Sequence, residues 1–160
     1  MFAFYIFLML MILFLRPGMD SNNINLIPFK SIAEGINVYD GIRYRLIDEQ
    51  VWGNVLIFIP SGIYIMILRK KSSIPKSMLT IFLLSLSAEV MQFIFKIGAS
   101  DIDDIILNCL GGIIGILIYC LLKKLFKTNK KIKNAVAVAS ICVGAPILIL
   151  GVLLFIVNYV

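Results

Sequence analysis

Long, unbroken apolar runs constrain this chain more than any other feature of its sequence. Five such stretches cover residues 2–15, 51–68, 77–95, 105–122 and 135–157. A membrane-spanning helix needs about 17 to 25 apolar residues, so the first stretch is short for a span. Backbone groups in lipid must pair with one another, which leaves only helices or a closed barrel. Because the runs are continuous rather than alternating, they predict helices.

Composition supports the same prediction. Of the 160 residues, 61% are hydrophobic and 15% are charged, whereas about a quarter of the residues in soluble domains are charged. We therefore expect an all-α integral membrane bundle, a single domain over 1–160 with about five transmembrane helices. The first run is expected to remain as a helix, because it lacks the basic start and the cleavage site of a signal peptide.

The basic residues predict an orientation for these spans. The loop 69–76 holds four Lys or Arg residues and the loop 123–133 holds six, out of fifteen in the chain. With five spans, both loops fall on the same side, which the positive-inside rule places in the cytoplasm. The N-terminus is then cytoplasmic, and eight of the nine acidic residues fall on the outer side.

Residue types disfavour several kinds of chemistry. The chain has no histidine, which excludes Ser-His-Asp catalysis and histidine metal sites. Cys109, Cys120 and Cys142 lie in apolar runs without metal-ligand spacing, so we expect buried, reduced thiols. The basic residues lie in short loops beside the spans, so nucleic-acid binding is not expected. No cofactor is expected.

A polar, Asn-rich stretch, 19–50, separates the first two apolar runs and falls on the outer side. Its scattered apolar residues favour short helices that lie in the membrane interface rather than a disordered linker.

Glu89 is the most informative single residue, because it lies inside the third apolar run. Ser85, Glu89, Gln92 and Lys96 follow one another at intervals of four, three and four, which places them on one helical face. A carboxyl group in a membrane helix usually faces the bundle interior or a polar cavity. Two interpretations stay open, a hydrogen-bonded pin between helices or part of a functional polar site.

An acidic run, Asp101, Asp103 and Asp104, leads into the fourth span. Ser100 or Asp101 is a candidate helix cap, and acidic residues are favoured in a first helical turn. A cap needs only one such residue, so three carboxylates indicate a further role. Oxygen-rich clusters can hold Mg²⁺ or Ca²⁺, but the spacing of a calcium-binding EF-hand loop is absent. No metal site is assigned.

The fourth span continues this face. Asp104, Asn108, Gly111 and Gly115 follow at intervals of four, three and four, so polar groups lie at its outer end and glycines lie deeper. A pair of glycines four residues apart permits close approach of another helix. We expect this face to pack against the third span, which would bring Asn108 and Asp104 near Glu89.

The second span carries Asn54 near its outer end and Pro60-Ser61-Gly62 midway. A proline removes a backbone hydrogen bond and bends a helix, so carbonyl groups near it are available to neighbours. A structural kink and a functional role both remain open for this motif.

Taken in order, these motifs resemble the VanZ-like family, which is named for a protein associated with teicoplanin resistance. The resemblance covers about residues 25–122. Many members carry an arginine shortly before the acidic run, where this chain has Gly98-Ala99-Ser100, and Lys96 is the candidate replacement. The matching motifs are Asn25-Leu-Ile-Pro28-Phe29, Asn54-Val-Leu-Ile-Phe-Ile-Pro60-Ser-Gly62, Glu89-x-x-Gln92 and Asp101-Ile-Asp103-Asp104-x-x-x-Asn108-x-x-Gly111.

The resemblance implies a multi-pass protein of the bacterial cytoplasmic membrane that is linked to the cell envelope. We expect a non-enzymatic protein in which an outer-leaflet polar pocket holds an amphiphilic molecule, such as a lipid-linked cell-wall precursor or a lipoglycopeptide, among membrane lipids. The expected pocket residues are Asn54, Glu89, Gln92, Asp101, Asp103, Asp104 and Asn108. The expected structural residues are Asn25, Pro28, Phe29, Pro60, Gly62, Gly111 and Gly115.

Two other classes of function stay open. An intramembrane enzyme acting on a lipid-linked substrate would use Glu89 as a general acid or base, with the aspartates as metal ligands, but the sequence offers no nucleophile beside a base. A structural or assembly subunit would use the polar residues only to hold helices together. The sequence carries no signal for an oligomeric state.

Overall fold

Three long helices form the centre of the computed structural model, which describes residues 5–7, 9, 24–39, 44–69, 73–95, 100–126, 128, 130–142 and 145–146. They are α3 (Glu49–Leu68), α4 (Ile74–Phe95) and α5 (Ile102–Phe126), and each is long and apolar enough to cross a membrane. They cover the second, third and fourth apolar runs. The first and fifth runs lie largely outside the described residues, so the count of five spans and the orientation of the termini stay predictions.

Charged residues mark where the long helices begin and end. Asp48 caps α3, since its carboxylate accepts the backbone N–H of Gln50 at 3.4 Å. Two acids occupy the first turn of α5, and Lys123 and Lys124 occupy its last turn. Both placements complement the helix dipole, whose N-terminal end is positive and whose C-terminal end is negative.

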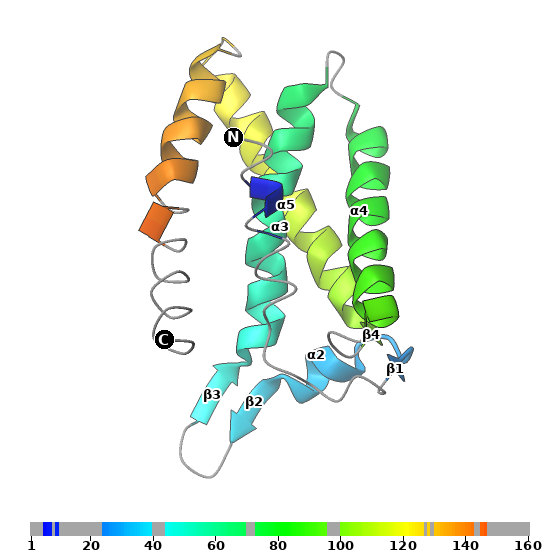
Figure 1. Ribbon diagram of the computed structural model, residues 1–160. Helices are drawn as coiled ribbons and strands as arrows, with labels where there is room; N and C mark the ends of the chain where they lie inside the picture. Colours follow the sequence, from blue (N-terminus) through cyan, green and yellow to red (C-terminus); the bar gives the residue numbers. More distant parts are fainter. Residues whose placement is uncertain are drawn as a thin grey trace, which may run out of the picture.

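The helix α5 packs on both α3 and α4 and crosses α3 at an angle (Figure 1), and its contact with α3 is the more extensive of the two. Glycines of α5 make this contact close. A Cβ added at Gly111 would lie 2.1 Å from the carbonyl oxygen of Val55, and one at Gly115 would lie 2.0 Å from that of Ile59. The prediction that this glycine pair faces the third span was therefore wrong, because it packs on the second span, α3.

The reason is that α3 offers a matching small residue. A Cβ at Gly62 would lie 2.1 Å from the carbonyl oxygen of Gly112, so neither helix has a side chain at the crossing point. Without side chains, van der Waals contact between the two backbones is possible. The glycine motif in the sequence predicted a close helix contact, but it did not predict which helix makes that contact.

A neighbouring face of α5 packs on α4. A Cβ at Gly112 would also meet the side chain of Ile81 at 2.5 Å, and Asn108 donates to Ser85 across the same contact at 3.0 Å. Thus Asn108 does lie against the third span, as predicted, although the glycine pair does not bring it there.

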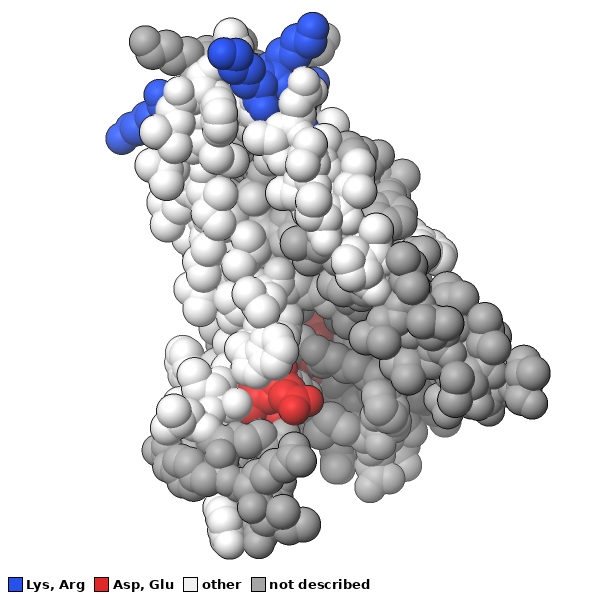
Figure 2. All heavy atoms as spheres, turned by 90° about the vertical axis from the view of Figure 1, so that its left-hand side faces the viewer, with Lys and Arg blue, Asp and Glu red and all other residues white. Residues whose placement is uncertain are grey.

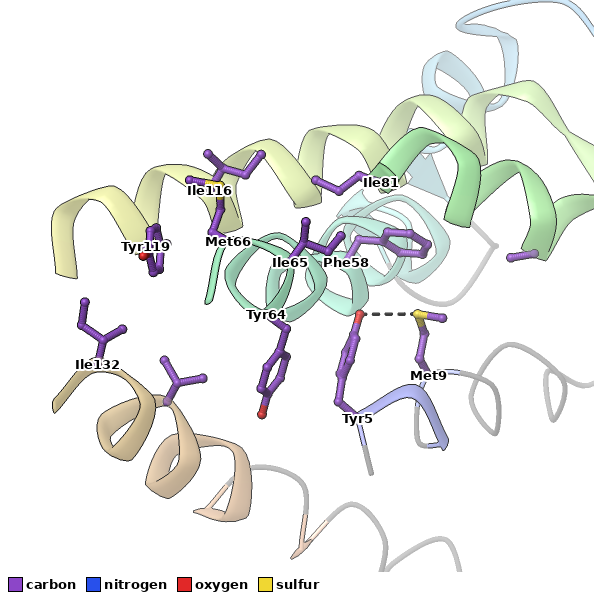
Figure 3. Packing of buried hydrophobic residues seen from close by; sticks show 12 residues of the cluster. Tyr5, Met9, Phe58, Tyr64, Ile65, Met66, Ile81, Ile116, Tyr119 and Ile132 are labelled. Atoms are coloured by element: carbon purple, nitrogen blue, oxygen red, sulfur yellow. Dashed lines mark hydrogen bonds between the residues drawn. The ribbon is translucent and has the colours of Figure 1, made fainter. Parts of the chain in front are cut away.

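The apolar core extends from α3 to the described parts of the N-terminal and C-terminal segments (Figure 3). Tyr5 stacks on Tyr64, with ring centroids 5.6 Å apart, and its hydroxyl donates to the carbonyl oxygen of Ile57 at 2.8 Å. Ile57 directly follows Leu56, whose carbonyl oxygen has no helical donor because Pro60 lacks an N–H group. The hydroxyl groups of Tyr64 and Ser140 are hydrogen-bonded at 2.8 Å, which joins α3 to the helical residues 130–142.

The described residues between the first two apolar runs, 24–39 and 44–50, are not purely helical. A short helix, α2 (Lys30–Glu34), is followed by an antiparallel hairpin of β2 (Ile36–Tyr39) and β3 (Tyr44–Ile47), in which Ile36 pairs with Ile47. The expectation of short helices was right for α2 and wrong for the hairpin, and the all-α class holds for the bundle alone. Aromatic and β-branched residues around an Asp-Gly dipeptide are the sequence signal for a hairpin.

The expectation of buried cysteines also needs correction. The thiols of Cys109 and Cys120 are half-buried and that of Cys142 is exposed, and all three are free. An apolar run does not imply burial inside the protein, because the positions of a span that face lipid are as apolar as those that face the bundle.

Most described basic residues lie at one end of the bundle and the buried acidic residues at the other, where Lys30 of α2 is also found (Figure 1). Figure 2 shows Lys and Arg gathered at one end of this face, and Asp and Glu toward the other. The basic end holds the end of α3, the start of α4 and the end of α5 (Figure 1). The acidic end holds α2, the hairpin and β1 (Ile24–Asn25), which pairs in parallel with β4 (Ser100–Asp101) (Figure 1).

Candidate functional site

Four carboxyl groups are buried together where α4 ends and α5 begins. The exposed fractions of Glu89, Asp101, Asp103 and Asp104 are 4%, 9%, 0% and 7%. A buried carboxylate is costly unless hydrogen-bond donors compensate it. The partners of each group therefore indicate what it does.

Asp103, in the first turn of α5, connects this helix to the start of α2. Its carboxylate accepts the backbone N–H groups of Phe29 at 2.5 Å and of Ile32 at 3.1 Å. These groups begin α2, and Phe29 at the N-cap position supplies no side-chain cap. The first N–H groups of a helix have no partner within it, so Asp103 caps α2 from a distant part of the chain.

Asp101 has two tasks. Its carboxylate accepts the backbone N–H of Asp103 at 2.9 Å, which makes it the cap of α5 between the two candidates of the sequence. It also accepts from the side-chain amide of Asn25, at 3.2 and 3.3 Å, and from the hydroxyl of Ser31. Asn25 is also its strand partner in the β1–β4 pair, so backbone and side chains join the same two segments.

Glu89 and Asp104 connect the three long helices. One oxygen of Glu89 accepts the backbone N–H of Asp101 at 3.3 Å and the hydroxyl of Ser100 at 3.5 Å, which ties α4 to the start of α5. Asp104 accepts a hydrogen bond from the side-chain amide of Asn54, which is 1% exposed and ties α5 to α3.

The contacts between α4 and α5 continue from this cluster along both helices. We call their polar residues, Ser85, Glu89, Asp104 and Asn108, the ladder. Ile81 faces Gly112, and Ser85 faces Asn108. Four residues advance a helix by about one turn, so the next step places Glu89 opposite Asp104. The regular steps of four on both helices indicate antiparallel packing in one register.

The Asn108–Ser85 pair lies farthest from the ends of α4 and α5 that form the cluster, and within the described residues it contains a polar atom without a hydrogen bond. Asn108 is 1% exposed and its amide nitrogen donates to Ser85, but its side-chain oxygen has no hydrogen-bond partner in the part of the chain that the structure describes. Ser85 lies ten residues before the end of α4, about 15 Å at 1.5 Å per residue. A buried acceptor without a partner costs about 1–3 kcal/mol.

Most of the residues that the sequence singled out lie in or beside this cluster. All seven expected pocket residues are buried, and Gln92 lies on the same face of α4 as Ser85 and Glu89. Of the expected structural residues, Asn25 contacts the cluster, whereas Pro28 and Phe29 are exposed. Lys96 lies outside the described residues.

Two contributing residues were missed by sequence reasoning. Ser31 bonds both Asn25 and Asp101, and no local pattern distinguishes it from other serines. Gly112 lies where α5 meets both neighbours, and its position directly after Gly111 is the only signal that the sequence offered. Among the described residues, no three or more Asp, Glu or Cys side chains are placed to hold a metal ion.

Comparison with known proteins places these residues in a family context. Residues 2–123 match the model of the VanZ/LLP1 family. The chain is 38% identical over 97 residues to Protein VanZ of Enterococcus faecium, a match that covers 61% of this chain and 57% of that protein. The aligned part thus spans little more than half of that relative. No solved structure matches the chain.

Proposed function

The chain belongs to the VanZ/LLP1 family of membrane proteins, and we propose that it is a non-enzymatic protein of the bacterial cytoplasmic membrane that binds an amphiphilic molecule. The polar head of that molecule contacts the ladder formed by Ser85, Glu89, Asp104 and Asn108, and its acyl chain stays in lipid. A lipid-linked cell-wall precursor or a lipoglycopeptide has this chemistry. Altered sensitivity to teicoplanin would follow from such binding.

One observation carries the proposal. The side-chain oxygen of Asn108 is buried at membrane depth and has no donor among the described residues, although the other polar groups of the ladder have partners. A protein rarely keeps an unpaired polar group in its interior without a role for it. A ligand that supplies an N–H or O–H donor would satisfy this oxygen.

The proposal is tested by replacing Asn108 with leucine, which has a similar volume and no polar atoms. The purified variant and the wild type, in lipid nanodiscs, are titrated with a lipid-linked cell-wall precursor and with teicoplanin, and binding is followed by native mass spectrometry. We expect the affinity for at least one of the two to fall about tenfold, equivalent to about 1.4 kcal/mol.

Ser87→Ala is the matched control, because Ser87 lies on the exposed face of α4 and bonds only the carbonyl oxygen of Leu83 in its own helix. Circular dichroism and thermal unfolding establish that both variants fold. Equal affinities for wild type, Asn108→Leu and Ser87→Ala would contradict the proposed binding site.

A second function, that of a structural or assembly subunit, is favoured by the hydrogen bonds of the acidic run. Asp101 and Asp103 bind donors of Asn25, of Phe29 and of α5 itself. Glu89→Gln separates the two functions, because an amide oxygen still accepts from the backbone N–H of Asp101. A structural subunit with this change behaves like the wild type, whereas a ligand site that depends on the carboxyl group loses affinity.

A further inference from the structure

The segment from Ile24 to Ile32 has its polarity reversed relative to a loop in water. Its polar groups point inward, since Asn25, Ser31 and two backbone N–H groups bond to buried aspartates. Its large apolar side chains point outward. The exposed fractions of Leu26, Ile27 and Phe29 are 72%, 61% and 62%.

Phe29 adds a conformational cost to this arrangement. Its φ and ψ are 66° and 5°, in the left-handed region, and it is the one non-glycine residue with positive φ in the described part of the chain. A residue with a Cβ is disfavoured there, and bulky residues adopt this conformation rarely. A large aromatic side chain thus stands outward where glycine or asparagine would be less strained.

The exposed apolar side chains lie beside other exposed apolar residues, those at the end of α4. The β1–β4 pair places the segment beside the start of α5, at the end of the bundle where α4 also finishes (Figure 1). The last residues of α4, Phe93, Ile94 and Phe95, are 50%, 65% and 60% exposed. A loop that turns its apolar side chains away from the protein, beside membrane-spanning helices, fits an apolar environment and not water.

We infer that Leu26, Ile27 and Phe29 form an apolar ridge that inserts into the interfacial layer of the lipid bilayer. Asp101 and Asp103 hold the polar side of the segment against the bundle and so keep the ridge turned toward lipid. This role goes beyond the proposed function, because it holds whether or not the ladder binds a molecule.

Tryptophan fluorescence tests the insertion. The chain has one tryptophan, so Trp52→Phe provides a background into which Leu26→Trp or Phe29→Trp is introduced. Glu34→Trp is the matched control, because Glu34 is an exposed, polar position on the adjacent α2. The full-length variants are reconstituted in vesicles of phosphatidylcholine and phosphatidylglycerol in equal parts, with and without brominated acyl chains.

We expect tryptophan at 26 or 29 to emit at shorter wavelength than at 34. Brominated lipid should quench it at least twofold more than at 34, and aqueous iodide should quench it less. Equal iodide quenching at all three positions would overturn the insertion. Shielding of position 26 from both quenchers would indicate a protein partner and would also overturn it.

The unsubstituted protein supplies a second measurement, in case a variant does not fold. A diazirine-bearing phospholipid in the same vesicles is photolysed, and the labelled residues are identified by mass spectrometry. Labelling within residues 26–29 and not at Glu34 is the expected result. Absence of label from residues 26–29, with label present on α4, would contradict the insertion.

Asp103→Ala tests the holding role of the aspartates. The change removes the acceptor of two backbone N–H groups, and we expect the blue shift of Phe29→Trp to be lost while the helix content is retained. Glu34→Ala is the control for loss of a carboxylate nearby. An unchanged emission spectrum in the Asp103→Ala background would show that the ridge does not depend on this residue and would overturn that part.

Discussion

The buried carboxylates at the acidic end accept hydrogen bonds from the first backbone N–H groups of two helices, α2 and α5. Asp103 supplies donors of α2 with an acceptor from another helix, and Asp101 caps α5 while bonding Asn25. Hydrogen bonds to a charged acceptor contribute about 1.5–3 kcal/mol each. Asp101, Asp103 and Asp104 are close in sequence but bond different partners. The sequence alone did not predict which partner each carboxylate has.

A prediction for Phe29 concerns the stability of two variants. Glycine is usually more destabilising than alanine, and at this position we expect the opposite order. Both Phe29→Gly and Phe29→Ala remove the ring, but only glycine adopts a φ of 66° without a steric penalty. We expect the glycine variant to be more stable than the alanine variant by about 1 kcal/mol. Equilibrium unfolding in mild detergent measures the difference, and a less stable glycine variant would refute the left-handed conformation.

At the scale of helices, packing depends on where side chains are missing. Gly62 of α3 meets Gly112 of α5, while Gly111 and Gly115 approach carbonyl groups of α3. Two motifs that were considered separately in the sequence, one in the second span and one in the fourth, are thus two sides of a single contact.

Alanine at Gly115 should therefore be destabilising. Its Cβ would lie 2.0 Å from the carbonyl oxygen of Ile59, which is backbone and cannot rotate away. Separating the helices to relieve this contact is expected to cost about 1–3 kcal/mol. Leu110→Ala is the control, because Leu110 is 47% exposed on the same helix. Thermal unfolding in detergent that shows equal effects for the two variants would argue against the α3–α5 crossing.

The register of α4 against α5 gives a second prediction for helices. Cysteines at positions 85 and 108, in a background without the three native cysteines, should form a disulfide under mild oxidation, because these residues face each other. A pair at 85 and 115 is the control, since Gly115 packs on α3. Band shifts on non-reducing gels report both, and cross-linking of the control alone would show a different register.

For the whole molecule, the orientation in the membrane stays a prediction that rests on the distribution of basic residues. Most described basic residues, among them Lys76 and Lys124, lie at one end of the bundle, whereas the buried acids lie at the other end together with α2 and its Lys30 (Figure 1). The positive-inside rule predicts that the acidic end faces the outside of the cell. The ladder and the apolar ridge both lie toward that end.

Thiol labelling of intact cells tests this orientation. In a background without native cysteines, a membrane-impermeant maleimide should label Glu34→Cys and should leave Lys76→Cys unlabelled until the cells are permeabilised. Both positions are exposed, so accessibility within the protein does not limit the reaction. Labelling of position 76 alone in intact cells would reverse the orientation.

The sequence by itself predicted that this protein lies in a lipid bilayer and that its long apolar runs are helices. In lipid, a continuous apolar run can pair its backbone groups only within a helix. The sequence also identified the polar faces around Glu89 and Asn108, because a period of 3.6 residues decides which side chains share a face. Only the tertiary structure decided that Gly111 meets α3 and that Asp103 bonds Phe29. Such choices depend on contacts between residues far apart in the chain, and local patterns show that a partner is needed without specifying which one.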